Sequence, residues 1–413
     1  MVWNTGEYML KRLSRIHPLT FILVAALLIR LIGIEHGFPK ITHPDEPTII
    51  RSALGIRFDP NTKHFDWPHL YIYLNYFVYF YFSKVRNHLE LAGLKEAVTN
   101  LMPLMWNDNL IFYYLTRAVS ALFGAFTAIP IYLAAKTIFN KRIGLWAALV
   151  MCFIPFHVRY SHYALTEAPM VFLIAWAIYF CARAYLTPKL LNYILAGFFV
   201  GLAASTKYNG VFIAVSVFLA YVMYFKWREY FNFKNMLKPI FSALACVIAF
   251  LIGTPYALLD SKNFLRSDSP IGALWQFQNV GKVSFEQHIF QFFRSLTVKL
   301  PEDFGYTFFI AFLFVFGYLV YELIKTHKLE HRNLWFFVLP AMLFIYYVSG
   351  LEKYRSHYFM ITYPYVAITA GYFIDFLLGS IKKRYLKVIL CSVFFVIPVI
   401  MSIIHIISLA NKT

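Results

Sequence analysis

Long apolar segments recur along the whole chain, and they restrict its possible folds more than any other feature. The segments 211–225 and 239–259, for example, contain no charged residue. A run of about 20 apolar residues is long enough to cross a bilayer as a helix. Only helices and closed barrels satisfy the backbone hydrogen bonds in lipid, and the alternating pattern of barrel strands does not occur here. We therefore predict an all-α polytopic membrane protein.

The composition supports this fold class and argues against a soluble protein. The 413 residues are 60% hydrophobic and 14% charged, whereas soluble proteins carry about a quarter charged residues. The net charge of +18 is typical of nucleic-acid-binding proteins. However, the basic residues lie in short loops between apolar runs, where membrane orientation and anionic lipid headgroups account for them. We predict membrane lipids as partners and no nucleic acid.

The spacing of the apolar runs predicts about eleven membrane-spanning helices. The apolar piece 69–82 lies between the first two spans and is too short for a third, so we predict an interfacial or half-buried helix there. Counting it as a span would place most loop lysines and arginines outside, against the positive-inside rule. The predicted spans are 17–34, 110–136, 143–157, 168–186, 190–206, 210–226, 239–259, 304–324, 333–349, 358–378 and 386–408.

The basic residues also predict an orientation. The first span follows a basic cluster formed by Lys11, Arg12 and Arg15. It is longer than the core of a signal peptide and lacks a small-residue cleavage site, so we expect it to remain uncleaved with the N-terminus in the cytoplasm. We predict one membrane domain over 1–413 in a prokaryotic cytoplasmic membrane, without a separate soluble domain. Its two large outer loops are 35–109 and 260–302.

Two predicted outer loops carry acidic residues at the membrane boundary. Asp45 and Glu46 follow the first span, and either carboxylate could take a proton from a hydroxyl or an amine. Glu167 stands at the predicted start of a helix, shortly before Pro169. A solvated Pro-rich turn would equally explain the first pair, and a favourable interaction with the helix dipole would explain Glu167. The residues alone leave both interpretations open.

Three basic residues stand in the short predicted outer loops, which contain only one other, Arg159. They are Lys207, Lys353 and Arg355. Snorkelling explains an isolated cation at the end of a span, but it explains a group on one face less well. Fixed cations at headgroup level are what a lipid-linked phosphate needs, and arginine can contact it through two hydrogen bonds.

Taken in order, these elements resemble the GT-C membrane glycosyltransferases, in particular family 39, with its protein mannosyltransferases and lipid A aminoarabinose transferases. The likeness covers roughly the first 210 residues and recurs near 350–371. In that family six elements follow one another along the chain. They are an Asp-Glu pair, an aromatic-acidic-x-Pro segment, an Arg-containing span, an acid before a helix, a Thr-Lys pair and a basic-aromatic patch. The matching segments are 43–46, 64–68, 116–120, 167–169, 206–207 and 353–355, with Pro364 and Gly371.

The resemblance implies a GT-C-type bundle with juxtamembrane helices in the first outer loop. It implies an enzyme that moves one sugar, a mannose-like hexose or a pentose, from undecaprenyl or dolichyl phosphate to a lipid, glycan or protein acceptor. The expected reaction is an inverting single displacement on the non-cytoplasmic face. No cofactor is required, although a divalent metal could bridge two acids and the phosphate. Trp67 stands where the aminoarabinose transferases have a lysine, so that phosphate contact must come from elsewhere.

The resemblance also implies roles for individual residues. Asp45 is expected to act as the base or to position the acceptor, with Glu46 beside it, and Glu167 is expected to assist near the acceptor or the sugar. The carrier phosphate is expected to be held by Lys207, Lys353 and Arg355. Weaker candidates for contacts with the acceptor or the sugar are His43, Asp66, Arg117, His162, Tyr208 and Tyr354. No residue is assigned as a metal ligand.

Other functions fit parts of the pattern. A transporter or flippase of a lipid-linked or anionic solute would typically place ionisable residues deep within its spans and show paired repeats. A polymerase or ligase would share the carrier phosphate but transfer whole glycans. A purely structural subunit would give the acids and cations of the outer loops no purpose.

Overall fold

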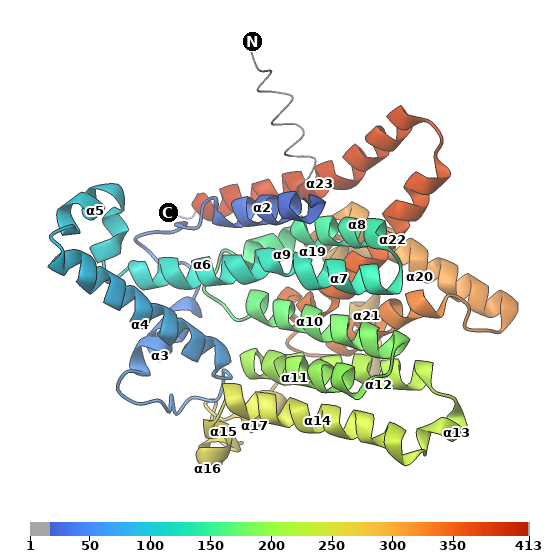
Figure 1. The fold of residues 1–413 in the computed structure, drawn as a ribbon, viewed down its shortest axis with the longest axis horizontal. Helices are drawn as coiled ribbons and strands as arrows, with labels where there is room; N and C mark the ends of the chain where they lie inside the picture. Colours follow the sequence, from blue (N-terminus) through green and yellow to red (C-terminus); the bar gives the residue numbers. More distant parts are fainter. Residues whose placement is uncertain (1–16, 412–413) are drawn as a thin grey trace, which may run out of the picture.

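The computed structural model describes residues 17–411, so the basic cluster before the first span lies outside the described residues. Within that range the chain is built from helices, and its only β pairing is an isolated antiparallel bridge between Lys282 and Leu351. Most of the long helices run roughly parallel to one another (Figure 1). The prediction of an all-α membrane fold is confirmed.

Every segment predicted as a span is helical. The helices there are α2 (Pro18–Leu31), α6 (Ile111–Phe126) with α7 (Ala128–Ile138), α8 (Lys141–Cys152) with α9 (Pro155–Tyr160), α10 (Glu167–Leu186), α11 (Leu190–Thr206), η2 (Tyr208–Ile213) with α12 (Ala214–Tyr224), α14 (Phe233–Gly253), α20 (Tyr306–Thr326), α21 (Arg332–Ser349), η4 (Ser356–Thr362) with α22 (Tyr363–Ser380), and α23 (Arg384–Ala410). Among the described residues, seven helices are long and apolar enough to cross a membrane, and three further apolar ones are shorter. The number of eleven spans therefore stays a prediction.

Close packing of α11 against α14 follows from two glycines in the sequence. Gly197 and Gly201 are four residues apart and so lie on one face of α11. A Cβ atom at Gly197 would lie 1.9 Å from the carbonyl oxygen of Ser242, and one at Gly201 would lie 2.1 Å from that of Cys246. Small residues at this spacing let the backbones of two membrane helices approach closely. The contact holds the end of α11 at Thr206, from which the chain enters the candidate site.

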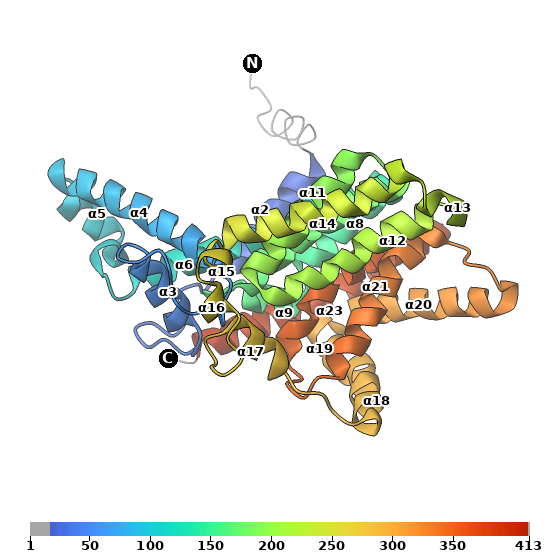
Figure 2. The ribbon, with the colours of Figure 1, turned by 90° about the horizontal axis from the view of Figure 1, so that it is seen from below.

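The helix predicted over 69–82, between the first two spans, is longer than expected. The piece expected over 69–82 is helix α4 (Leu70–Leu91), which has 22 residues. Its second half carries polar residues such as Lys84 and Glu90 and is exposed to solvent, so an estimate from apolar length alone stopped too early. It is absent from the described helices that could cross a membrane. Figure 2 shows α4 projecting beyond the bundle.

The two large loops meet at one end of the bundle. The first contains α3 (Glu46–Gly55), α5 (Lys95–Leu101) and η1 (Pro103–Trp106), as the prediction of juxtamembrane helices requires. The second contains α15 (Tyr256–Leu259), α16 (Ser261–Phe264), α17 (Ala273–Gln278), α18 (Phe285–Arg294), the π-helical turn η3 (Ser295–Lys299) and α19 (Leu300–Phe304). The backbone amide of Phe65 donates to the carbonyl of Ile271 at 2.6 Å, and Asn61 Nδ2 donates to Asp260 Oδ2 at 2.7 Å. These bonds tie the segment after α3 to the second loop around α15–α17, at the same end of the molecule (Figure 2).

Candidate active site

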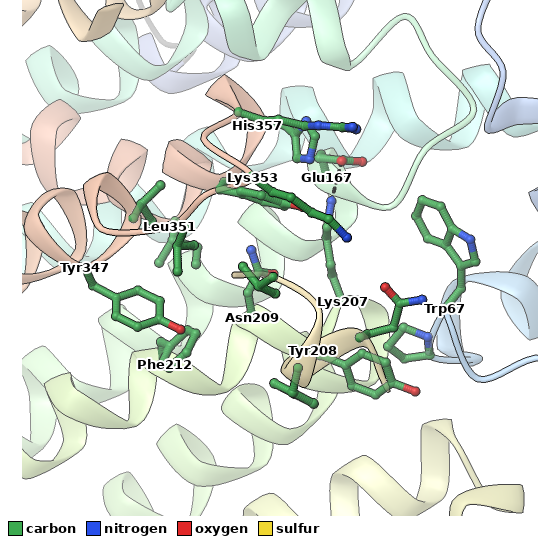
Figure 3. Close-up of a pocket in the computed structure, with 18 of the residues that line it drawn as sticks. Trp67, Glu167, Lys207, Tyr208, Asn209, Phe212, Tyr347, Leu351, Lys353 and His357 are labelled. Atoms are coloured by element: carbon green, nitrogen blue, oxygen red, sulfur yellow. Dashed lines mark hydrogen bonds and ion pairs between the residues drawn. The ribbon is translucent and has the colours of Figure 1, made fainter. Parts of the chain in front are cut away.

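A cavity of about 430 Å³ lies where the two loops meet the ends of α10 and α11. Its polar side includes Asp45 and Asp66 from the first loop and Lys353 from the segment before η4. Its apolar side includes Phe212 and Tyr347, which Figure 3 shows on the side away from Trp67. The cavity therefore offers charged groups and an apolar wall to one ligand.

The turn after α11 places three consecutive side chains in this cavity. The helix ends at Thr206, and η2 begins at Tyr208. Gly210 allows the tight return, because a Cβ atom there would lie 2.6 Å from the backbone carbon of Ala203. Lys207, Tyr208 and Asn209 line the cavity as a result (Figure 3).

Lys207 is already paired with an acid. Its Nζ donates to Glu167 Oε1 at 2.5 Å, and Glu167 is 3% exposed at the first turn of α10. The rings of Trp67 and Tyr358 lie 5.9 and 5.8 Å from the ammonium group. Such rings favour a cation over their faces. The charge of Lys207 is therefore balanced inside the protein before any ligand binds.

The other two predicted phosphate contacts are available. Lys353 and Arg355 both line the cavity and are exposed. In the part of the chain that the structure describes, neither of them forms an ion pair. The ammonium of Lys353 lies 5.3 Å from the ring of Trp275, in the second loop. These two residues give the cavity a net positive wall.

Asp45 and Glu46 are adjacent in sequence but have different surroundings. Asp45 stands immediately before α3, is half-buried and lines the cavity. Within residues 17–411 its side chain makes no capping hydrogen bond, so the carboxylate is free to contact a ligand. Its backbone amide donates to His43 Nδ1 at 3.2 Å, which fixes the turn before the helix.

Glu46 is turned away from the cavity and is fully buried. Arg117 holds it through two bonds of 2.8 Å, from Nε to Oε1 and from Nη2 to Oε2. The amide of Ala164 also donates to Oε1 at 2.8 Å. Arg117 Nη1 donates to the carbonyls of Ile34 and His36 at 2.9 and 2.8 Å. The structure thus does not bring Glu46 to the cavity beside Asp45, because its charge joins α3, α6 and the loop before α10.

The weaker candidates divide in the same way. Asp66 and Tyr208 line the cavity, whereas His43 does not, and its ring contacts that of Tyr163 in a tilted arrangement with 4.8 Å between ring centroids. His162 is buried, with its ring nitrogens 2.8 and 2.9 Å from the carbonyls of Val158 and Ile32. Tyr354 faces away from the cavity, and its hydroxyl donates to the carbonyl of Gln291 at 3.1 Å.

Some residues of the cavity were not assigned from the sequence. His357 lies against the Glu167–Lys207 pair, and Trp67 lies on its other side (Figure 3). Asn209 points into the cavity between Lys207 and the segment that carries Lys353 (Figure 3). The sequence offered one indication that His357 could lie in the cavity, because it belongs to the basic-aromatic segment 352–358. However, the direction of each side chain depends on where η4 begins, which the sequence pattern does not define.

Metal ligation was left open by the sequence. Among residues 17–411, no group of three or more His, Cys, Asp or Glu side chains could hold a metal ion. Asp45 and Asp66 are the acids of the cavity that have no cationic partner in the described chain.

Comparisons with solved structures show the fold. ArnT from Cupriavidus metallidurans, solved with undecaprenyl phosphate, matches with a TM-score of 0.60 and 12% identity over 95% of this chain and 70% of that chain. The oligosaccharyltransferase of Archaeoglobus fulgidus matches with a TM-score of 0.57 and 13% identity over 95% of this chain and 53% of that chain. These two matches show that the chain has a GT-C-type helical fold.

Two sequence comparisons match part of the chain. Residues 93–265 match the family described as dolichyl-phosphate-mannose-protein mannosyltransferase. The dolichyl-phosphate-mannose–protein mannosyltransferase 1 of Saccharomyces cerevisiae is 33% identical over 158 residues, which are 35% of this chain and 18% of that protein. The chain thus matches less than a fifth of the length of this yeast protein.

Proposed function

We propose that this protein is a glycosyltransferase of the GT-C type. It transfers a single sugar, a mannose-like hexose or a pentose, from a polyprenyl phosphate to a lipid, glycan or protein acceptor. One observation carries the proposal: a carboxylate without a partner in the described chain, Asp45, shares a cavity with two exposed cations, Lys353 and Arg355. A displacement at an anomeric carbon needs these two features at opposite ends. The names of the relatives, with dolichyl-phosphate mannose and undecaprenyl phosphate, support the donor class.

The charges suggest how the leaving group is stabilised. A polyprenyl phosphate leaves as an anion that needs no proton, so the protein has only to stabilise its charge. Lys353 and Arg355 supply this positive charge, and arginine can contact two phosphate oxygens at once. Phe212, Phe344 and Val348 on the apolar wall suit the first isoprene units of the carrier.

The acceptor is activated at the other end. Asp45 takes the proton of the incoming hydroxyl or amine while its oxygen or nitrogen forms the bond to the anomeric carbon. The carbon–oxygen bond to the phosphate breaks on the opposite face, so the configuration inverts. Glu167 fixes Lys207 at 2.5 Å in the cavity wall, which makes Glu167 a positioning residue in this proposal. Glu46 and Arg117 hold the loop that presents Asp45.

The position in the cell is part of the same proposal. With the N-terminus in the cytoplasm, the loops 35–109 and 260–302 face the outside of a prokaryotic cytoplasmic membrane. The cavity then lies on the non-cytoplasmic face, at the level where the phosphate of a lipid carrier is found.

Release of the carrier tests the proposal. Purified wild-type protein in nanodiscs should release free polyprenyl phosphate from lipid-phosphate-linked sugars when an acceptor-rich membrane extract is present. Asp45→Asn should reduce this rate about 100- to 10,000-fold, which is the usual contribution of a general base. Thermal unfolding and the affinity for polyprenyl phosphate should stay unchanged. Product size separates the transfer of one sugar from the transfer of a whole glycan.

A matched control is Asp59→Asn, which removes an exposed acid from the same loop, outside the cavity. It should retain the wild-type rate. Near-normal release by Asp45→Asn would refute Asp45 as the base. No release by folded wild-type protein from any donor would refute the glycosyltransferase and favour transport of a lipid-linked or anionic solute.

A further inference from the structure

Two hydrogen-bond acceptors in the cavity have no partner and no role in the mechanism above. They are Asp66 Oδ1 and Asn209 Oδ1, both buried and without a hydrogen bond within residues 17–411. Buried polar atoms in folded proteins nearly always have a partner. Two of them in one cavity indicate that a ligand supplies the missing donors.

The backbone directly before Asp66 is fixed by two hydrogen bonds. The hydroxyl of Tyr208 donates to the carbonyl of Phe65 at 2.7 Å, and the amide of Phe65 donates to the carbonyl of Ile271 at 2.6 Å. The segment before Asp66 is therefore fixed both to η2 and to the second loop. Burial, the largest influence, raises the pKa of the Asp66 carboxyl above its usual value. The same η2 turn carries Asn209, so the two acceptors belong to one rigid unit.

The position of this unit indicates which part of the substrate it contacts. Asp66 lies close enough to Asp45 for the two charges to interact. The next residue, Trp67, has its ring 5.9 Å from the ammonium of Lys207. The segment thus runs from Asp45 towards Lys207, on the part of the cavity wall that carries the Glu167–Lys207 pair. In a displacement reaction the sugar lies between the attacking acceptor and the leaving phosphate, so groups along this path face the sugar.

Resting on the proposed function, we propose that Asp66 and Asn209 form the sugar subsite, with Asp66 Oδ1 accepting a hydrogen bond from a donor group of a non-acidic sugar. A sugar ring offers several hydroxyl donors, and an amino group would serve equally well. The carboxylate of a uronic acid placed against Asp66 and Asp45 would meet two like charges, which repel strongly in a partly buried site, so we expect such a sugar to be a poor substrate. The subsite thus selects the sugar by charge and by one donor position.

A double-mutant cycle between the protein and the sugar tests this subsite. The probes are undecaprenyl-phosphate mannose, its 2-, 3-, 4- and 6-deoxy analogues, and the corresponding mannuronate, or the same series of whichever sugar the wild type accepts. Asp66→Asn should lower kcat/KM for the complete sugar about 10- to 100-fold, as expected when a hydrogen bond to a charged group is weakened. With one deoxy analogue the wild type should show a similar loss, and Asp66→Asn should add little to it.

Asn209→Ala supplies a second cycle. This variant should likewise add little to the loss of kcat/KM that one of the deoxy analogues causes in the wild type. The affinity of Asp66→Asn for free undecaprenyl phosphate should equal that of the wild type, because the carrier alone does not reach the subsite. A weakened affinity for the free carrier would indicate a structural role and overturn the proposal.

Three further outcomes would also overturn it. They are unchanged kinetics in Asp66→Asn, equal additional losses on every deoxy analogue, and efficient use of the mannuronate by the wild type. Failure of the wild type with every donor is a separate result, since it refutes the proposed function itself.

Discussion

Two buried acid–base pairs lie near the same end of the bundle, and they differ in how completely they are enclosed. In the first, Arg117 and Glu46 are both fully buried, and the ring of Phe38 lies 4.9 Å from the guanidinium. In the second, Lys207 and Glu167 share one hydrogen bond of 2.5 Å, and the side chain of Lys207 is 15% exposed.

The difference separates a fixed support from a surface that a ligand can reach. Arg117 uses Nε, Nη1 and Nη2 on partners from α3 and the first loop, so the pair has no capacity left for a substrate. Lys207 can still turn part of its ammonium towards the cavity. The two pairs therefore have different roles. Arg117 and Glu46 hold the first loop in place, whereas Lys207 lies where a ligand can reach it.

The largest effect on stability is expected from the enclosed pair. Glu46→Gln should lower the free energy of unfolding by about 3–5 kcal/mol, because it leaves the buried Arg117 guanidinium without its counter-charge. Chemical denaturation in one detergent, followed by circular dichroism, measures this change. The double variant Glu46→Leu/Arg117→Leu should recover part of the loss. A stability of Glu46→Gln equal to wild type would show that the pair is not a support.

An intermediate effect is expected from the open pair. Glu167→Gln should cost about 1–3 kcal/mol, the range for leaving a buried hydrogen-bonding group poorly paired. Unlike Glu46→Gln, it should tighten the binding of free polyprenyl phosphate several-fold, because the charge of Lys207 is no longer balanced by a carboxylate 2.5 Å away. Turnover should fall, since Lys207 loses its fixed position. Titration with the free carrier measures the affinity, and weaker binding would contradict a cationic role for Lys207.

The smallest effect on stability is expected at the exposed wall. Arg355→Ala should change the free energy of unfolding by less than about 0.5 kcal/mol. It should nevertheless raise KM for the lipid-linked donor about 10-fold or more, through loss of a charge-assisted contact with the phosphate. Lys262→Ala, an exposed lysine of the second loop outside the cavity, is the control. Equal effects of Arg355→Ala on donor and acceptor would argue against a phosphate contact.

Much of the candidate site could be predicted because its residues stand at the ends of apolar runs. Glu167 at the start of α10 and Lys207 at the end of α11 are recognisable from the hydropathy pattern alone. Neither pattern predicted that the two form an ion pair, and Lys207 was accordingly expected to be free for the phosphate. The length of α4 was also missed, because its solvent-exposed second half needs no apolar side chains.

The sequence by itself determined that this chain is a helical membrane protein and which loops carry its charged residues. Both properties are local, since the cost of a charge or an unpaired backbone in lipid depends on each segment alone. Only the tertiary structure decided which of two neighbouring acids faces the cavity. Glu46 is buried by Arg117, 71 positions later in the chain, and Asp45 is left open by the same contact. A pairing at that separation depends on how the helices pack, which no local pattern encodes.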